Sequence, residues 1–360
     1  MTPWLYRFAV LTAAVTVGLI VAGATVTSTG SGDAVPDWPL AYGSFFPRMV
    51  GGVLIEHSHR LIAGLTASLI AVLAFWLWRR EPRRWVRHLG VWVLVAVLAQ
   101  AALGGLRVLI ISQEDLQAAA LRVTGVGHVN PVRIGIAATH AFLAQVVLCL
   151  TFVLAATTAP AGLDARPGGG ASRPGPARGL MAALVLAVFV QLMLGALMRH
   201  MGAGLVVPDF PRVFGGWWPA MDRLPYNPQA PFAVPFETYR LQVLVHFSHR
   251  VMALVVTGLV AGVAGYFWRT RRAAGPWTSP IPGRLVGGLV ALTAAQVGLG
   301  ALAIWTQKAV PVTIAHVAVG ALLLGSSVLL LLWTWRVRPL AGERAADLSL
   351  SVGLKPARNV

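Results

Sequence analysis

Long apolar segments alternate with short polar connections along this chain of 360 residues. A bilayer core about 30 Å thick is crossed by roughly 20 apolar helical residues. Eight segments are long enough, and they cover residues 7–27, 52–78, 88–110, 132–157, 179–199, 239–268, 284–306 and 312–335. The pattern predicts an all-α integral membrane protein with eight transmembrane helices, because a helix satisfies its own backbone hydrogen bonds in lipid.

Composition agrees with this interpretation. Hydrophobic residues make up 57% of the chain and charged residues 11%, whereas soluble domains carry about 25% charged residues. The lipid bilayer is therefore the expected partner of most of the surface. The net charge of +17 is typical of membrane proteins with basic cytoplasmic loops. No basic run is interleaved with aromatic residues, so no nucleic-acid partner is expected.

Arginines gather in every second connection and after the last apolar segment. They are Arg79, Arg80, Arg83, Arg84 and Arg87, then Arg166, Arg173 and Arg178, then Arg269, Arg271 and Arg272, then Arg336 and Arg338. By the positive-inside rule, both termini lie in the cytoplasm. We expect a multi-pass protein of the bacterial inner membrane. The first apolar segment resembles a signal peptide but lacks a clear cleavage site, so it is expected to stay as the first helix.

The chain contains an internal repeat. The positions Gly30, Gly32, Pro36, Asp37, Pro39, Gly43 and Pro47 each recur 172 residues later, from Gly202 to Pro219. Each copy has four predicted helices, so the repeat keeps its orientation in the membrane, in contrast to the inverted repeats of many transporters. The expected fold is two pseudo-symmetric four-helix bundles, side by side. The second copy has about 18 extra residues, roughly 220–237.

The predicted boundaries follow from this repeat. The N-terminal bundle is expected over residues 1–160 and the C-terminal bundle over 179–338. A segment rich in Gly, Pro and Arg, residues 161–178, reads as a flexible cytoplasmic linker. The polar residues 339–360 form a cytoplasmic tail.

Four histidines occupy repeated positions near the ends of apolar segments. His59 and His249 are 190 residues apart, and each is followed by a partner further along its own half, His140 and His316. Facing side chains in a four-helix bundle can hold a cofactor, and ionisable residues within a membrane are functional candidates. The pattern favours two pairs of heme iron ligands. The alternative is a histidine that is hydrogen-bonded between helices. Zinc is less favoured, since no cysteine cluster accompanies either pair.

Glu56 precedes His59 by three residues, so both side chains share a helix face. Its carboxyl group could stabilise positive charge or move protons at a reacting group, or it could simply pair with an arginine. The matching position in the second half is His246. This asymmetry favours one working site and one auxiliary site.

Arg60 and Arg250 follow the repeated histidines and are candidates either for contacts with heme propionates or for snorkelling to lipid headgroups. Three further histidines break the repeat and are expected to be solvated: His57, His128 and His200. A glutamine–glycine pair four residues apart recurs at Gln100 and Gly104, Gln191 and Gly195, and Gln296 and Gly300. Helix packing is the simplest role for these pairs, and a structural lid is the simplest role for the Gly- and Pro-rich loops.

Taken together, these residues resemble the heme A synthase family over nearly all of residues 5–335. The shared pieces are TGSG and PDWP in the first long loop, Glu56-x-x-His59-Arg60, His140, His249-Arg250 and His316. The resemblance implies conversion of heme O to heme A for cytochrome oxidase assembly, with the C8 methyl oxidised to a formyl group by successive hydroxylations.

The resemblance also implies a role for each site residue. His59 and His140 would hold the iron of the substrate heme, and Glu56 would be essential for chemistry. His249 and His316 would hold the iron of a heme B. The implied partners are a farnesyltransferase that supplies heme O and an electron donor, and a homo-oligomer is also considered.

This chain departs from the family in its loops. Many members carry a cysteine pair in each long loop, at positions that hold Val35, Ala41, Val207 and Val213 here. A thiol-dependent step at these positions is excluded in this chain.

Two other function classes fit the residues. A membrane cytochrome b with two bound hemes would transfer electrons without modifying heme. A transporter or heme chaperone would hold no permanent pigment. Glu56 favours the enzyme, because an electron carrier has no evident need for it.

Overall fold

The computed structural model describes residues 3–112, 131–159, 176–230, 233–274 and 281–336. Within these ranges the chain forms eight long helices and two short 3-10 helices. The long helices are α1 (Pro3–Ser28), α2 (Gly51–Arg80), α3 (Arg84–Ser112), α5 (Pro131–Thr158), α6 (Pro176–His200), α7 (Phe236–Ala274), α8 (Ile281–Trp305) and α9 (Val310–Arg336). All eight are long and apolar enough to cross a membrane. The predicted all-α membrane class is confirmed.

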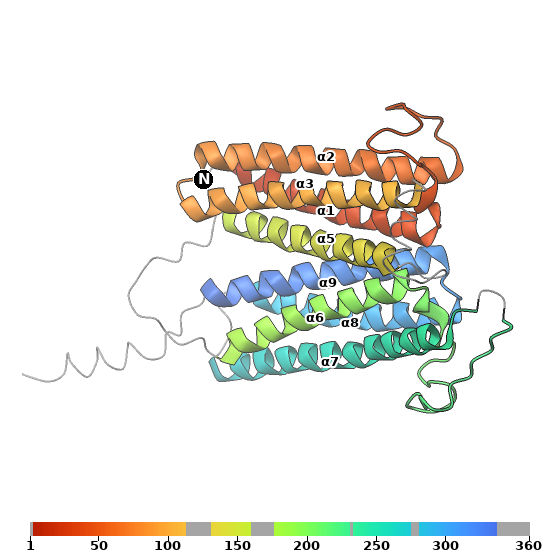
Figure 1. Cartoon of the computed structure of the whole chain (residues 1–360). Coiled ribbons are helices and arrows are strands. Elements are labelled where there is room, and N and C mark those ends of the chain that lie inside the picture. Colours follow the sequence, from red (N-terminus) through yellow and green to blue (C-terminus); the bar gives the residue numbers. More distant parts are fainter. Residues whose placement is uncertain (1–2, 113–130, 160–175, 231–232, 275–280, 337–360) are drawn as a thin grey trace, which may run out of the picture.

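The eight helices form two four-helix bundles that lie side by side (Figure 1). In the first bundle α1 packs on α2, α2 on α3, α3 on α5, and α5 returns to α1. In the second bundle α6, α7, α8 and α9 close in the same order. The bundles meet where α9 packs against α1 and α5, and where α5 packs against α6. Within each bundle, two pairs of helices therefore face each other diagonally.

The helices are longer than the apolar segments that predicted them. The segment 239–268 becomes α7, a helix of 39 residues that extends over polar residues at both ends. Hydropathy marks the length that lies in lipid, whereas backbone hydrogen bonding continues beyond it. α6 begins at Pro176, within the segment predicted as linker, because proline is well suited to the first position of a helix. The rest of that linker and the tail 339–360 lie outside the described residues, so the domain boundaries stay predictions.

Each bundle has an aliphatic core at the end where the predicted connections are rich in arginine. In the first bundle it includes Leu5, Leu73, Leu77 and Leu154. In the second it includes Leu184, Leu289, Leu324 and Leu330. We call the opposite end, where the long loops after α1 and α6 connect the helices, the loop end. The repeated histidines lie in the loop-end half of the bundles, away from these cores.

The two long loops have the same conformation, although only part of their sequence is shared. Each begins with a left-handed glycine, Gly30 or Gly202, that caps a short 3-10 helix, η1 (Ser31–Asp33) or η2 (Ala203–Leu205). Each then contains a cis proline and a small bridge, Ala41 with Ser44 and Val213 with Gly216. The 172-residue repeat is therefore a repeat of three-dimensional structure.

The extra residues of the second half fold onto the start of α7. Tyr226 donates a hydrogen bond to the carbonyl of Val234, and Tyr239 on α7 donates to that of Pro225. The rings of Tyr226 and Tyr239 are 5.4 Å apart. The insertion thus forms a small aromatic extension of the second loop.

The interface between the bundles predicts a stability effect. A Cβ atom on Gly325 of α9 would lie 2.6 Å from Cε1 of Phe152 on α5. We expect Gly325→Ala to lower the free energy of unfolding by about 1–3 kcal/mol, because the packed ring must shift. Thermal unfolding in detergent, followed by circular dichroism, measures this.

The matched control is Gly258→Ala on α7, where an added Cβ meets no atom within 4 Å. This variant should be neutral or slightly stabilising, because alanine favours a helix over glycine. Equal melting temperatures for the two variants would contradict close packing between the bundles.

Candidate heme site

The four repeated histidines come from diagonally opposed helices, one pair in each bundle. His59 on α2 and His140 on α5 belong to the first bundle, and His249 on α7 and His316 on α9 belong to the second. The remaining two helices of each bundle each present a glycine to one of these rings. The chain thus places two imidazoles inside each bundle, as the sequence predicted.

Each histidine ring lies directly against a glycine backbone. A Cβ atom on the glycine would approach Cε1 of the ring to between 3.0 and 3.3 Å in all four cases. The pairs are Gly23 with His59, Gly104 with His140, Gly195 with His249, and Gly300 with His316. Any larger residue would push the ring away, so the four glycines fix how far each imidazole lies from its neighbouring helix.

The two rings of the second bundle lie close to each other. The ring centroids of His249 and His316 are 6.5 Å apart. The amide nitrogen of Gln191 lies 3.3 Å from Nε2 of His249, and that of Gln296 lies 3.4 Å from Nε2 of His316. Each amide is therefore close enough to hydrogen-bond the ring nitrogen that it faces.

The first bundle has a different set of amides around its rings. Gln100 donates to the backbone carbonyl of His140 at 2.9 Å and not to its ring. Gly23, which faces His59, has no glutamine four residues before it. Leu19 stands there, whereas Gln191 stands at the matching position in the second half. His59 and His140 still lie within range of electrostatic interaction with each other. The glutamine–glycine pairs, expected only to pack helices, surround the histidines in three of the four cases.

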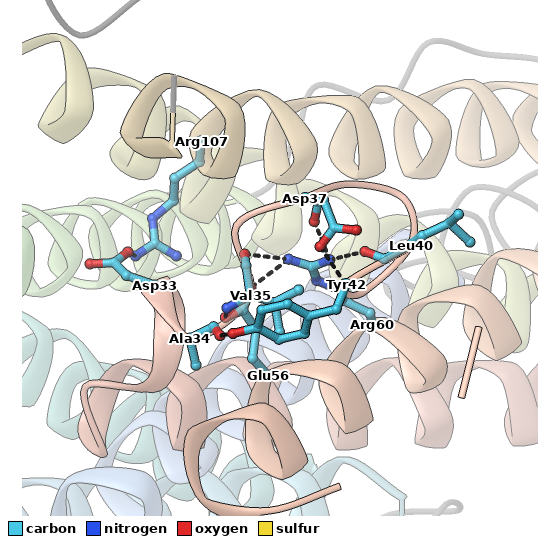
Figure 2. Close-up of polar contacts among 9 residues, drawn as sticks. All are labelled: Asp33, Ala34, Val35, Asp37, Leu40, Tyr42, Glu56, Arg60 and Arg107. Atoms are coloured by element: carbon cyan, nitrogen blue, oxygen red, sulfur yellow. Dashed lines mark hydrogen bonds and ion pairs between the residues drawn. The ribbon is translucent and has the colours of Figure 1, made fainter. Parts of the chain in front are cut away.

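Glu56 is buried at the start of α2 and holds the first long loop (Figure 2). Its Oε2 accepts the backbone N–H of Val35 at 3.0 Å, and its Oε1 pairs with Arg60 at 2.6 Å. Pairing with an arginine was one of the two roles considered for this carboxyl group. The structure shows that contact, and the catalytic role stays a prediction.

Arg60 and Arg250 have a role that the sequence did not suggest. The guanidinium of Arg60 donates to the carbonyls of Val35, Asp37 and Leu40 at 2.6 to 3.2 Å (Figure 2). Arg250 donates to the equivalent carbonyls of the second loop, those of Val207, Asp209 and Arg212. Each arginine fastens a loop to the helix that carries the histidine. The proposed contacts with propionates stay predictions.

The same loops are stabilised internally by a carboxylate. Asp37 accepts the N–H groups of Tyr42 and Gly43 at 2.7 and 2.8 Å, and Asp209 accepts those of Phe214 and Gly215. The N–H of Gly43 in particular holds the pKa of Asp37 below its ordinary value. Burial opposes ionisation of Asp209, but the amides of Gly215 and Phe214 outweigh it, and its pKa is also lowered.

One expectation about the other histidines needs correction. His57 is only 4% exposed, and its Nε2 lies 2.9 Å from the carbonyl oxygen of Phe45. The prediction that it is solvated is wrong, because the loop folds back over the start of α2. His200 is half-buried at the end of α6. His128 lies outside the described residues. In the second half, His246 is 3% exposed and its Nδ1 contacts the carbonyl of Ala203.

The sequence reasoning missed Arg107, which lies on α3 at the loop end of the first bundle. It is three residues after Gly104 and seven after Gln100, and thus on the same helix face. Its guanidinium would be 2.8 Å from a Cβ on Gly32 and is 3.7 Å from Asp33 (Figure 2). The spacing from Gln100 could have signalled it, but a single arginine near a helix end also fits a headgroup contact.

The fold and these side chains define a class: a multi-pass membrane protein of two four-helix bundles, each with a histidine pair across its interior. A sequence model described as "Cytochrome oxidase assembly protein" (COX15-CtaA) matches residues 50–328. The chain belongs to that family.

Several curated relatives are named heme A synthase. The protein from Geobacillus kaustophilus is 28% identical over 336 residues, covering 92% of this chain and 91% of the relative. The protein from Methylorubrum extorquens is 30% identical over 334 residues, covering 82% and 77%. That from Halalkalibacterium halodurans is 28% identical over 269 residues, covering 74% and 76%.

The spacing of the two rings in the second bundle fits a heme. Imidazole nitrogens that ligate one metal ion from opposite sides, with bonds of about 2 Å, put the ring centroids roughly 6 Å apart. The 6.5 Å between His249 and His316 is close to this value. The Nδ1 atoms of all four histidines are buried without a hydrogen-bond partner in the described part of the chain. Each ring is therefore held by packing against glycine and keeps a buried polar atom whose hydrogen-bonding capacity is unused.

The stability of the first long loop is expected to depend on pH through the carboxylate of Asp37. The folded pKa of Asp37 is lowered from 3.8, so its contribution to loop stability is fully present above that value and is lost as the pH falls through the lowered pKa. We expect protection of the Tyr42 and Gly43 amides from hydrogen exchange to be constant down to about pH 4 and to fall below it.

Asp37→Asn should remove this dependence and speed exchange of these two amides by about tenfold or more at neutral pH. The control is Asp222→Asn, whose exposed carboxylate pairs with neighbouring Arg223. A loss of protection already between pH 6 and 5, or no effect of Asp37→Asn, would contradict the proposed role.

Proposed function

We propose that this protein converts heme O to heme A for cytochrome oxidase assembly, oxidising the C8 methyl to a formyl group by successive hydroxylations. The observation that carries the proposal is the pair of histidines in each bundle, each ring seated against a glycine of the next helix. Membership of the cytochrome oxidase assembly family, and relatives named heme A synthase, support a role in heme A biosynthesis.

In this proposal the first bundle, within residues 1–160, binds the substrate. His59 and His140 ligate the iron of heme O and orient the macrocycle between their helices. The second bundle, within residues 179–338, holds a heme B through His249 and His316. Bound heme iron supplies the redox chemistry, and the protein supplies orientation and surroundings.

The long loops pack over the loop end of each bundle. Trp38 packs its indole on α3, where a Cβ on Gly105 would lie 2.5 Å from the ring. In the second half Phe210 packs on Trp305 at 6.1 Å between centroids. Arg60 and Arg250 hold both loops in place over the helices that carry His59 and His249.

Glu56 distinguishes the two bundles. It lies one turn from His59 on the same helix face, and its carboxylate is fixed by Arg60 and the N–H of Val35. We assign it to stabilise positive charge or accept a proton at the reacting group of the substrate. His246, at the matching position, has no carboxylate to do this. The proposal therefore assigns the reaction to the first bundle.

The proposal includes an orientation and partners. Both termini face the cytoplasm of a bacterial cell and the loop end faces the outer side, as the arginine distribution predicts. A farnesyltransferase supplies heme O, and a separate electron donor serves the redox reaction. An external oxidant supplies the inserted oxygen, because conversion of a methyl to a formyl group removes four electrons. A homo-oligomer is compatible with the same sites.

The alternative is a membrane cytochrome b that transfers electrons without modifying heme. One observation favours it: both oxygens of Glu56 already have structural partners in the loop. Pigment analysis separates the two functions.

Glu56→Ala should lower heme A formation by at least about 100-fold, the scale of a lost acid–base group. Cells that supply heme O express the variant, and the extracted pigments are identified by chromatography and mass spectrometry. His246→Ala, the matched change in the second half, should still form heme A. If wild type yields neither heme A nor a hydroxylated heme, the enzyme is ruled out in favour of the cytochrome.

Ligand replacement tests the two histidine pairs separately. His249→Met or His316→Met should shift the absorption spectrum of the retained heme, because thioether replaces imidazole at the iron. His59→Met or His140→Met should instead abolish turnover. Wild-type spectra and activity in all four variants would disprove the ligation scheme.

A further inference from the structure

Arg107 lies where a ligand of the first bundle would meet the loop end. Gln100, Gly104 and Arg107 follow one another along one face of α3, and the first two contact His140. Arg107 is one turn further toward the loop. It is within range of electrostatic interaction with both His59 and His140. The residue is thus beside the candidate heme site without being a ligand of iron.

The hydrogen-bonding capacity of Arg107 is largely unused. A guanidinium has five N–H donors. Arg60 uses its terminal nitrogens for three carbonyls and Glu56. The Nε of Arg107 is buried without a hydrogen-bond partner among the described residues, and its nearest carboxylate oxygen, on Asp33, is 3.7 Å away. A guanidinium with unused donors, 21% exposed, can bind an anion.

The charge around Arg107 is unbalanced toward the positive. Asp33 is shared between Arg107 and Arg133, at 3.7 and 2.7 Å. His200 lies within electrostatic range of both arginines. Glu56 is already paired with Arg60. Within the described residues, one carboxylate thus serves two guanidiniums, so a ligand with negative charge would be stabilised here.

We propose that Arg107 binds the carboxylate side chains of the porphyrin held in the first bundle. The planar fork of arginine matches a carboxylate and can donate two parallel hydrogen bonds to it. The inference rests on the proposed function, since a porphyrin must lie between His59 and His140. Arg107 would orient the ring by anchoring its acidic edge at the loop end. It replaces Arg60, whose donors are occupied, as the candidate for this contact.

The second half has a different cation at this place. Lys308, at the loop end of the second bundle, lies 3.3 Å from a Cβ on Gly204, the repeat partner of Gly32. Lys308 is exposed and carries a point charge in place of a fork. Lys308→Gln is therefore a matched control that removes a cation from the same position of the other bundle.

The test compares two probes, ferric protoporphyrin IX and its dimethyl ester, in which both carboxylates are neutral. The full chain carrying His249→Ala and His316→Ala is titrated in lipid nanodiscs, so that the bis-histidine absorption spectrum reports the first bundle. Esterification should weaken binding by about 10- to 100-fold, the scale of a charge-assisted hydrogen bond. In this background Lys308→Gln should leave the preference for the free acid over the ester unchanged.

Adding Arg107→Gln should weaken binding of the free acid by a similar factor and abolish the preference for it over the ester. Arg107→Lys should keep part of the preference. Unchanged binding of the ester by Arg107→Gln shows that the bundle still folds. The proposed role of Arg107 would be overturned by either of two results. One is a preference for the free acid as large in Arg107→Gln as in the parent protein. The other is an equal loss of affinity for both probes. Absence of any bis-histidine spectrum in the parent and wild type would instead overturn the proposed function.

Discussion

The close approach of each histidine to a glycine on the next helix is the constraint on which the site depends. Bundle helices pack at distances set by the side chains between them, and glycine lets a ring lie against the backbone itself. In this protein the four contacts involve Gly23, Gly104, Gly195 and Gly300. In each bundle the two rings come from diagonally opposed helices and lie against the other two helices. The aliphatic cores lie in the opposite half of the bundles. A residue larger than glycine at any of the four positions would move a histidine ring.

A second constraint connects the loops to this site. Arg60 and Arg250 each follow a histidine, so the same short stretch of helix carries both the ring and the group that fastens the loop. Three loop carbonyls converge on each guanidinium. Such carbonyls must find donors when they lie near the membrane. The lid over each bundle is therefore positioned by the helix that it covers. Glu56 adds a further contact with the first loop, and His246 at the matching position contacts the second loop through the carbonyl of Ala203. The carboxylate itself is present in the first half only, which joins its proposed chemistry to the position of that loop.

Much of the architecture was predictable from the sequence. Apolar length predicted eight helices, and the 172-residue repeat predicted two bundles of parallel orientation; the structure confirms both. The four histidines and their pairing within halves were also predictable, because their positions repeat. The conformation of the loops was not. Nothing in the sequence pattern alone indicates that Arg60 binds carbonyls of residues 20 to 25 positions earlier, or that His57 is buried beneath the loop. Such contacts arise when distant segments fold together.

The sequence by itself determined the class, the repeat and the residue types at the site, because burial in lipid imposes a periodic and compositional pattern that is readable along the chain. Only the tertiary structure decided how those residues are used. In the structure the glutamine–glycine pairs lie against the histidines. Arg60 hydrogen-bonds carbonyl groups of the first loop. The tertiary structure also brought Arg107 on α3 within electrostatic range of His59 and His140 on two other helices. The physical reason is that hydrogen-bond donors are limited: which arginine is left to bind a ligand depends on which carbonyls the fold brings within reach.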